Sequence, residues 1–94
     1  MAAYIIADVK VTDPVQYEHY RKWASEAISS HRAKVLVRGG ATEGLEGREP
    51  GRIVVLEFDD MTHARSFYHS QEYTRAREAR ANAAVMNLLI VEGI

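Results

Sequence analysis

The sequence predicts a single α+β domain whose strands and helices follow the order β-α-β-β-α-β. Apolar residues at every second position mark four strands, and apolar residues three or four apart mark the helical regions between them. The 94 residues are enough for one domain and too few for two. Residues 1–94 are therefore expected to form one domain of the α+β class.

The first strand is expected at Tyr4–Val11. Its odd-numbered residues from Ile5 to Val11 are apolar, whereas its even-numbered residues from Tyr4 to Lys10 are mixed. Because side chains alternate between the two faces of a strand, one face should be dry and the other should carry ionisable groups.

A helix is expected from Pro14 to about Ser30. Asp13 can accept hydrogen bonds from the free N–H groups of its first turn, and Gln16 completes the pattern of a capping box. Residues three or four apart form its apolar stripe: Tyr17, Tyr20, Ala24, Ala27, Ile28 and His31.

The second half of the chain repeats the alternation. The expected elements are strands at Lys34–Arg38, Arg52–Asp59 and Met86–Glu92, and a helix after Asp60 that restarts at Ser70 and runs to about Ala81. Residues 42–51 are rich in glycine and form the one clear loop. The unbroken apolar run after Arg52 is typical of a central strand.

This order gives the ferredoxin-like plan, a four-stranded antiparallel sheet with the helices on one face. The other face is uncovered, although it carries apolar side chains: Tyr4, Ile6, Ile53, Val55 and Leu89. A contiguous apolar patch normally marks an interface, and a closed twofold dimer is the commonest way to bury it. The sequence therefore predicts a homodimer through the open sheet face, with a barrel-like space between the two sheets.

Composition argues against several classes of partner. A net charge of −1 disfavours nucleic-acid binding, which needs a basic surface. No apolar run reaches the ~18–20 residues of a membrane span, and the N-terminus lacks a signal-peptide pattern, so a cytoplasmic protein without membrane contact is expected. Without cysteine, an H-E-x-x-H motif or a glycine-rich nucleotide loop, no metal or other cofactor is expected.

Short motifs along the whole chain resemble a known family. They are Ala3-Tyr4-Ile5-Ile6-Ala7, Val11-Thr12-Asp13-Pro14 with Tyr17 and Tyr20, Arg38-Gly39-Gly40, Leu45-Glu46-Gly47, Val54–Phe58, Ala64–Tyr68, Ser70–Tyr73 and Val91–Gly93. In order and spacing they resemble the bacterial domain of unknown function family number 1330. The resemblance implies the dimeric α+β barrel superfamily, which includes small antibiotic-biosynthesis-type monooxygenases and muconolactone isomerases, and it leaves the activity open.

The chain departs from the family pattern in two places. His31-Arg32-Ala33 stands where relatives tend to carry glycine, and Phe67 stands where tryptophan is frequent. The first departure is expected to stiffen a turn, and the second to reshape a pocket wall.

Three charged residues interrupt apolar strands: Asp8, Arg38 and Glu57. A charge in such a place is costly unless it is paired. If the three meet, Arg38 can bind a carboxylate or enolate oxygen while a carboxylate of raised pKa moves a proton, which makes them the candidate catalytic residues. The structural alternative, an ion pair that only satisfies these charges or fixes the dimer register, is the simpler explanation. The direction of Arg38 is open, because the glycines after it can bulge the strand.

Tyr4 and His69 are candidate ligand-binding residues. Tyr4 shares the strand face that the dimer is expected to enclose. His69 lies at the break between the two helical segments and is the histidine best placed to carry a proton.

The other aromatic residues predict core packing, with the lining of a cavity as the alternative. They are Tyr17, Tyr20, Trp23, Phe67, Tyr68 and Tyr73. The cluster of Arg75, Arg77 and Arg80 predicts a solvated helix face, with phosphate binding as the alternative.

Two functions fit these features. The first is binding or conversion of a small organic acid or aromatic compound without a cofactor, in an isomerase-like or monooxygenase-like reaction. Its site would lie between the sheet and the helices or within the dimer barrel. The alternative is a non-enzymatic dimeric binding or regulatory module in which the charge pairs are structural.

Overall fold

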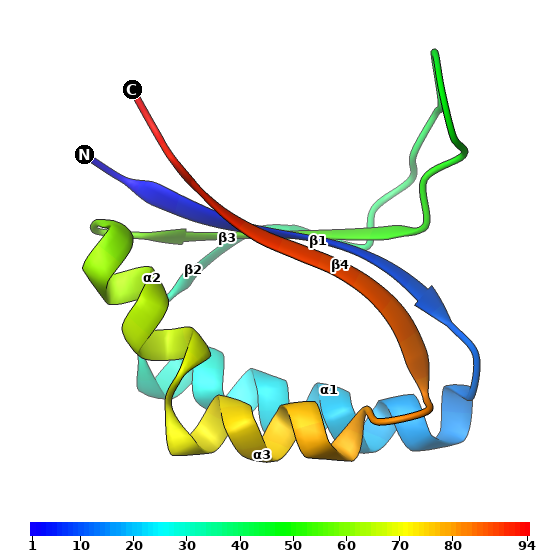
Figure 1. Cartoon of the computed structure of the whole chain (residues 1–94), viewed down its shortest axis with the longest axis horizontal. Coiled ribbons are helices and arrows are strands. Elements are labelled where there is room, and N and C mark those ends of the chain that lie inside the picture. The colour runs from blue at the N-terminus through cyan, green and yellow to red at the C-terminus, as the bar shows by residue number, and fades with distance from the viewer.

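The molecule consists of one sheet with all its helices on one side (Figure 1). The computed structural model describes residues 1–94. The elements are β1 (Ala3–Val11), α1 (Pro14–Ser30), β2 (Lys34–Arg38), β3 (Arg52–Phe58), α2 (Met61–Tyr68), α3 (Gln71–Ala79) and β4 (Ala84–Glu92). The predicted order is confirmed, and the second helical region is divided into α2 and α3.

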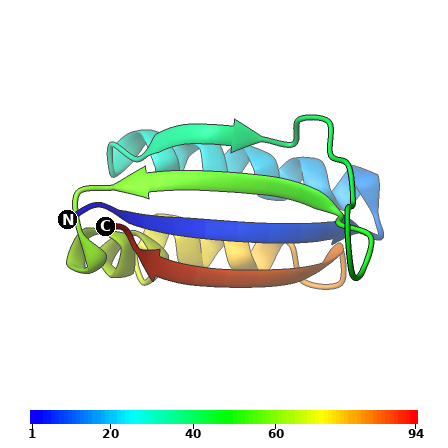
Figure 2. The same ribbon diagram turned by 90° about the horizontal axis from the view of Figure 1, so that it is seen from above.

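The four strands lie in the order β2-β3-β1-β4, and every neighbouring pair is antiparallel. Figure 2 looks onto the face that the helices leave uncovered, with the two chain ends close together at one edge of the view. The apolar β3 occupies a central position, as its sequence predicts. This arrangement is the ferredoxin-like plan of the α+β class.

The core lies between the sheet and the helices. On β1 it contains alternate residues, Ala3, Ile5, Ala7 and Val9, all of them buried. They pack against residues of the predicted helical stripe: Tyr17, Tyr20, Ala24 and Ala27. The intervening residues of β1 point to the open face, so the period of two in the sequence separates core from open surface.

Each helix begins at a residue that the sequence marks as a cap. Asp13 accepts a hydrogen bond from the Gln16 backbone N–H at 3.1 Å, and Asp60 and Ser70 make the equivalent bonds at α2 and α3. The predicted capping box is wrong in one respect. The Gln16 side chain donates to the Ala79 carbonyl at 2.8 Å and so joins α1 to the end of α3, while the Asp13 N–H is already bonded to another carbonyl.

Four boundaries differ from the sequence prediction. β1 begins one residue earlier, at Ala3, and β3 ends one residue earlier, at Phe58; the larger differences are in β4 and α3. β4 begins at Ala84, earlier than the predicted Met86, because Ala84 pairs with Val11 and extends the ladder with β1. α3 ends at Ala79, followed by a turn in which Asn82 has a φ of 65°. Alanine has a low strand propensity, so pairing with β1 overrides local preference here.

The turn after α1 contains Arg32 with a φ of 55°. Glycine adopts this left-handed region without steric cost and other residues do so less readily. No helix of the chain has both the length and the apolar composition that a membrane crossing requires.

Candidate functional site

A cavity of about 80 Å³ lies between the sheet and the helices. Its sheet side is formed by core residues of β1, β3 and β4, and its helix side by α1 together with Phe67 and Tyr73. By comparison, a cavity that holds a single water molecule needs a volume of about 10–15 Å³. The cavity therefore has room for a ligand of several non-hydrogen atoms.

Three arginines line this cavity: Arg21, Arg38 and Arg52. Arg21 is exposed and bonded to Glu18 at 3.1 Å. Arg38 and Arg52 take part in no ion pair within the chain, and the Nε of Arg52 is buried without a hydrogen-bond partner. No aspartate or glutamate is among the lining residues. Arg38 and Arg52 are therefore two positive charges beside the cavity without an acidic partner in the chain.

A bulge in β2 directs Arg38 towards this cavity. The pairing with β3 shifts between Val35 and Val37, so that Arg38 lies opposite Val54, a residue of the helix side of the sheet. A bulge adds one residue to a strand and reverses the faces of the side chains beyond it. The direction of the Arg38 side chain could not be predicted from the sequence, and in the structure it points to the helix side of the sheet.

Gly39 makes room for the second arginine. Its φ is 66°, and a Cβ at this position would collide with the guanidinium of Arg52. The backbone N–H of Gly39 also donates to the Ile53 carbonyl at 2.7 Å. The positive φ therefore favours glycine here, and the absence of a Cβ leaves room for the observed course of the Arg52 side chain.

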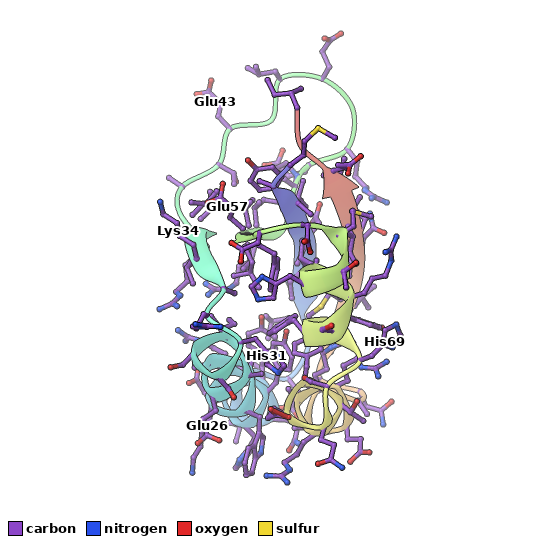
Figure 3. The ribbon with its side chains drawn as sticks, turned by 90° about the vertical axis from the view of Figure 1, so that its left-hand side faces the viewer. Glu26, His31, Lys34, Glu43, Glu57 and His69 are labelled. Carbon is purple, nitrogen blue, oxygen red and sulfur yellow. The ribbon has the colours of Figure 1, made fainter.

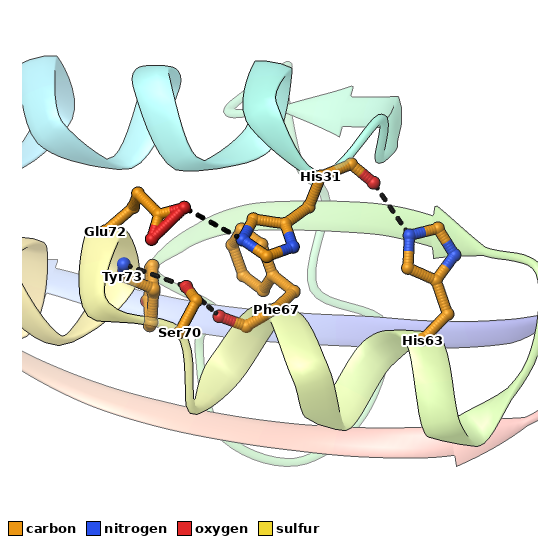
Figure 4. Close-up of polar contacts among 6 residues, drawn as sticks. All are labelled: His31, His63, Phe67, Ser70, Glu72 and Tyr73. Carbon is orange, nitrogen blue, oxygen red and sulfur yellow. Dashed lines mark hydrogen bonds and ion pairs between the residues drawn. The ribbon is translucent and has the colours of Figure 1, made fainter.

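The aromatic wall of the cavity is held by contacts at the ends of the helices (Figure 4). The Ser70 hydroxyl donates to the Phe67 carbonyl at 2.7 Å and accepts from the Tyr73 N–H at 3.1 Å. The rings of Phe67 and Tyr73 stack with centroids 4.7 Å apart. Ser70 thus joins α2 to α3 and fixes both rings at the cavity.

A second set of contacts in Figure 4 ties these helices to the end of α1. The Nε2 of His63 lies 2.7 Å from the His31 carbonyl, and the Nε2 of His31 lies 3.3 Å from a carboxylate oxygen of Glu72. A hydrogen bond from its own backbone N–H, together with His31, lowers the pKa of the Glu72 carboxyl. These contacts of His31, His63 and Glu72 hold α1, α2 and α3 in position relative to one another.

The hydroxyls of Tyr20 and Tyr73 meet at 2.7 Å within the core. Both residues line the cavity and are almost fully buried. Burial raises the pKa of both hydroxyls, so both keep their protons at neutral pH. Tyr20 and Tyr73 therefore pack in the core, as predicted, and they also line a cavity, which was the alternative.

Arg80 lies beside this hydroxyl pair. Its guanidinium is 5.8 Å from the centre of the Tyr20 ring, and its Nε is buried without a partner. The predicted solvated face is wrong for Arg80, because this half-buried residue follows the end of α3 and its guanidinium packs against Tyr20. Arg75 and Arg77 lie over the rings of Trp23 and Tyr68.

Asp8 lies on the opposite, open face of the sheet. Its carboxylate accepts a hydrogen bond from the Gly51 backbone N–H at 2.9 Å. A Cβ on Gly51 would collide with Asp8 and with the backbone of Val9. Asp8 thereby anchors the end of the long β2–β3 loop to β1.

Glu57 also lies on the open face, opposite Tyr4 on β1 and Lys34 on β2. Figure 3 shows Glu57 and Lys34 on the side of the sheet away from the helices. Hydrogen bonding to the Glu57 carboxylate raises the pKa of the Tyr4 hydroxyl. Asp8 is four residues further along β1 than Tyr4, or about 13 Å, so the three candidate catalytic residues do not converge within one chain.

His69, the other candidate ligand-binding residue, is exposed at the end of α2. It does not line the cavity, and Figure 3 shows it on the outer side of the helix layer. No group of three His, Asp or Glu side chains comes together in a way that could hold a metal ion.

Comparison with known proteins places this architecture in a family. The model of the family described as Domain of unknown function (DUF1330) matches residues 2–94. The chain belongs to this family. No curated protein matches it.

Several solved structures share the fold of this family member. A Rhodopseudomonas palustris protein of unknown function is 15% identical, with a TM-score of 0.78 over 99% of this chain and 82% of that one. A Thermobifida fusca protein described as dimeric and ferredoxin-like is 18% identical, with a TM-score of 0.67 over 99% and 92%. SnoaB, a cofactor-independent oxygenase from Streptomyces nogalater, is 10% identical, with a TM-score of 0.64 over 99% and 93%. At these identities the likeness establishes the fold.

Sequence reasoning missed Arg52 and the pairing of Tyr20 with Tyr73. The sequence pattern could have identified Arg52. It lies two residues before Val54 and four before Leu56, so alternation places its side chain on the core face of β3. The tyrosine pair has none, since its members are 53 positions apart and meet only when α3 packs on α1.

Proposed function

We propose that this DUF1330 member binds a small organic carboxylate in the cavity between its sheet and its helices. The observation that carries the proposal is the pair Arg38 and Arg52, which line a mostly apolar cavity that contains no acidic side chain. A guanidinium binds a carboxylate through two parallel hydrogen bonds. The apolar walls suit an aliphatic or aromatic frame.

The energetics of Arg52 support an anionic ligand. A buried donor without a partner costs about 1–3 kcal/mol, and more when the donor is charged. The Nε of Arg52 is in this condition. A carboxylate that entered the cavity would accept from this group and remove the cost.

The shared fold supports a wider form of the proposal, in which the bound acid is also converted. Structural neighbours are described as a cofactor-independent oxygenase and as a putative antibiotic biosynthesis monooxygenase. A cofactor-free isomerisation, or an oxygenation that uses dissolved O₂, is the corresponding reaction here. Incubation of candidate acids with the protein in air, followed by mass spectrometry, should show a product that the Arg52→Gln variant does not form. The absence of any product with acids that bind limits the function to binding.

We also propose that two copies pair through their open sheet faces. Leu89, Val91 and Val37 are 46%, 43% and 38% exposed on or beside this face in the single chain, and a contiguous apolar patch normally marks an interface. Two structural neighbours are described as dimeric. The loop between β2 and β3 rises on the same side of the sheet (Figure 1) and extends this surface.

A structural role for the open-face carboxylates is the second candidate for Asp8 and Glu57. It is favoured by the bond from Gly51 to Asp8 and by the position of Glu57 between Tyr4 and Lys34. In this role the two carboxylates hold the loop and the strands in register. Direct catalysis by Asp8 and Glu57 would need a ligand in the space between two sheets.

The test is calorimetric titration with benzoate and short aliphatic acids. Arg38→Gln and Arg52→Gln should each weaken binding about 10- to 100-fold, which corresponds to the ~1.5–3 kcal/mol of a hydrogen bond to a charged group. Arg48→Gln is the matched control, because Arg48 lies in the loop and lines a groove on the open face. Glu57→Gln should also leave the affinity unchanged.

Two results would contradict the proposal. One is the absence of binding by every acid tested. The other is binding that both cavity-arginine variants retain at wild-type affinity, which would place the ligand elsewhere.

A further inference from the structure

The inner wall of the cavity carries a polar feature that the arginines at its mouth do not explain. Tyr20 on α1 and Tyr73 on α3 both line the cavity and join at their hydroxyls, 2.7 Å apart. They are 9% and 3% exposed. Two hydroxyls therefore lie in an apolar environment, where each polar group needs a partner.

The hydroxyl pair has one hydrogen-bond donor more than it uses. Burial raises the pKa of both tyrosines, so that two protons are present. One proton forms the bond between the two oxygens, and the structure gives neither hydroxyl another side-chain or backbone acceptor. One O–H is thus left without an acceptor.

Arg80 adds a second unused donor to the same place. Its guanidinium lies 5.8 Å from the centre of the Tyr20 ring, and its buried Nε has no partner. The buried Nε of Arg52, which lines the same cavity, is a third donor without a partner. All the unsatisfied groups in and beside the cavity are therefore donors, and donors are complementary to oxygen acceptors.

We propose that the Tyr20–Tyr73 pair, with Arg80 beside it, is a second polar subsite, and that the ligand is a carboxylic acid with a further acceptor oxygen on a compact apolar frame. Hydroxybenzoates and small oxo acids belong to this class. This inference rests on the proposed function, in which the carboxylate binds Arg38 and Arg52. The second oxygen accepts from the free tyrosine O–H.

The subsite also suits developing negative charge. An O–H donor backed by a cation in a site without bulk water stabilises an enolate or phenolate oxygen more than a neutral one. The same two tyrosines would therefore favour the anionic form of a bound oxo acid or phenol.

Matched ligands test the subsite separately from the arginines. Benzoate, 3-hydroxybenzoate and 4-hydroxybenzoate share the carboxylate and the ring, and differ only in the second oxygen. At least one hydroxy acid should bind wild-type protein about tenfold more tightly than benzoate, as expected for one additional hydrogen bond. Calorimetry measures all three affinities on the same preparation.

The double variant Tyr20→Phe/Tyr73→Phe, which removes both O–H donors, should reduce this preference to less than about twofold, with little change in the affinity for benzoate. Tyr17→Phe is the matched control, because Tyr17 is buried and lines the same cavity but does not join the hydroxyl pair. It should keep the full preference. Thermal unfolding of each variant confirms that it is folded under the conditions of the titration.

The outcomes separate the two proposals. If none of the three acids binds the wild-type protein, the proposed function itself fails. If benzoate binds through Arg38 and Arg52 but neither hydroxy acid is preferred, only the subsite proposal fails. A preference that persists in the Tyr20→Phe/Tyr73→Phe double variant also overturns the subsite.

Discussion

The two faces of the sheet differ in how their charges are satisfied. On the open face, Asp8 accepts from the Gly51 N–H at 2.9 Å, and Glu57 lies beside the Tyr4 hydroxyl. On the helix face, Arg38 and Arg52 make no ion pair, and the Nε of Arg52 is buried without a partner. The fold accounts for charges that have partners within the chain. A buried donor without a partner that also lines a cavity, as the Nε of Arg52 does, favours a ligand there, and for this reason we proposed the site on the helix side of the sheet.

The faces differ equally in what covers their apolar residues. Helices bury Leu56 to 4% exposure, whereas Leu89 on the open face stays 46% exposed. The first face is a completed core, and the second is the face proposed to be covered by another copy of the chain. Each of the following changes tests one side of this comparison.

The largest effect is expected on the helix side. Leu56→Ala should lower the free energy of unfolding by about 2–5 kcal/mol, because it removes a buried side chain and leaves a cavity. Urea denaturation monitored by circular dichroism measures it. Leu45→Ala, at a loop position that is 84% exposed, should change stability by less than about 0.5 kcal/mol. A loss of less than about 1 kcal/mol for Leu56→Ala would place the main core elsewhere.

On the open face, Leu89→Asp should convert the proposed dimer into a folded monomer. Twofold symmetry brings the introduced charge into the interface twice, and one well-buried interface residue contributes about 2 kcal/mol or more. Sedimentation velocity at micromolar concentration measures the state, and Leu45→Asp on the loop is the control. A Leu89→Asp protein that remains dimeric would show that the copies pair through another surface.

A smaller effect is expected from the glycine that lies against Arg52. Gly39→Ala should cost about 1–2 kcal/mol of stability because φ is positive there, and it should weaken benzoate binding because the new methyl group displaces Arg52. Gly40→Ala is the matched control, since nothing lies within 4 Å of its Cβ position. Equal affinities of the two variants for benzoate would show that Arg52 is not held by Gly39.

The buried tyrosines predict a loss of stability at high pH. Their folded pKa is raised by burial, so above about pH 10 the unfolded chain loses protons that the folded chain keeps. Stability should be unaffected by them below pH 10 and should fall above it, by about 1.4 kcal/mol per pH unit for each tyrosine. Tyr20→Phe should make this decline shallower in urea titrations between pH 9 and 11. An unchanged slope would mean that Tyr20 ionises freely in the folded protein.

Much of the fold follows from local patterns in the sequence. The alternation in β1, the continuous apolar β3 and the caps Asp13, Asp60 and Ser70 each depend on neighbouring residues, and the structure confirms them. The family resemblance is confirmed by the match over residues 2–94. The start of β4 differs because pairing with β1 sets it.

The candidate site was less accessible to sequence reasoning. Asp8 and Glu57 stand out because charges are unusual in apolar strands, yet their partners lie on other elements. Arg38 needed the bulge at Val35 to Val37 to fix its face. The Tyr20–Tyr73 pair depends on the packing of two helices, and no local pattern specifies such a contact.

The most direct test of the central claim is to map where a carboxylate binds. Two-dimensional NMR of ¹⁵N-labelled protein, titrated with benzoate, reports both the backbone amides and the Nε–H groups of the arginines. The proposed site predicts saturable shifts at the Nε–H groups of Arg38 and Arg52 and at the amides of Tyr20 and Phe67, with Asp8 and Leu89 unaffected. Shifts confined to Asp8, Glu57 and Leu89 would contradict it and would move the ligand to the open face of the sheet.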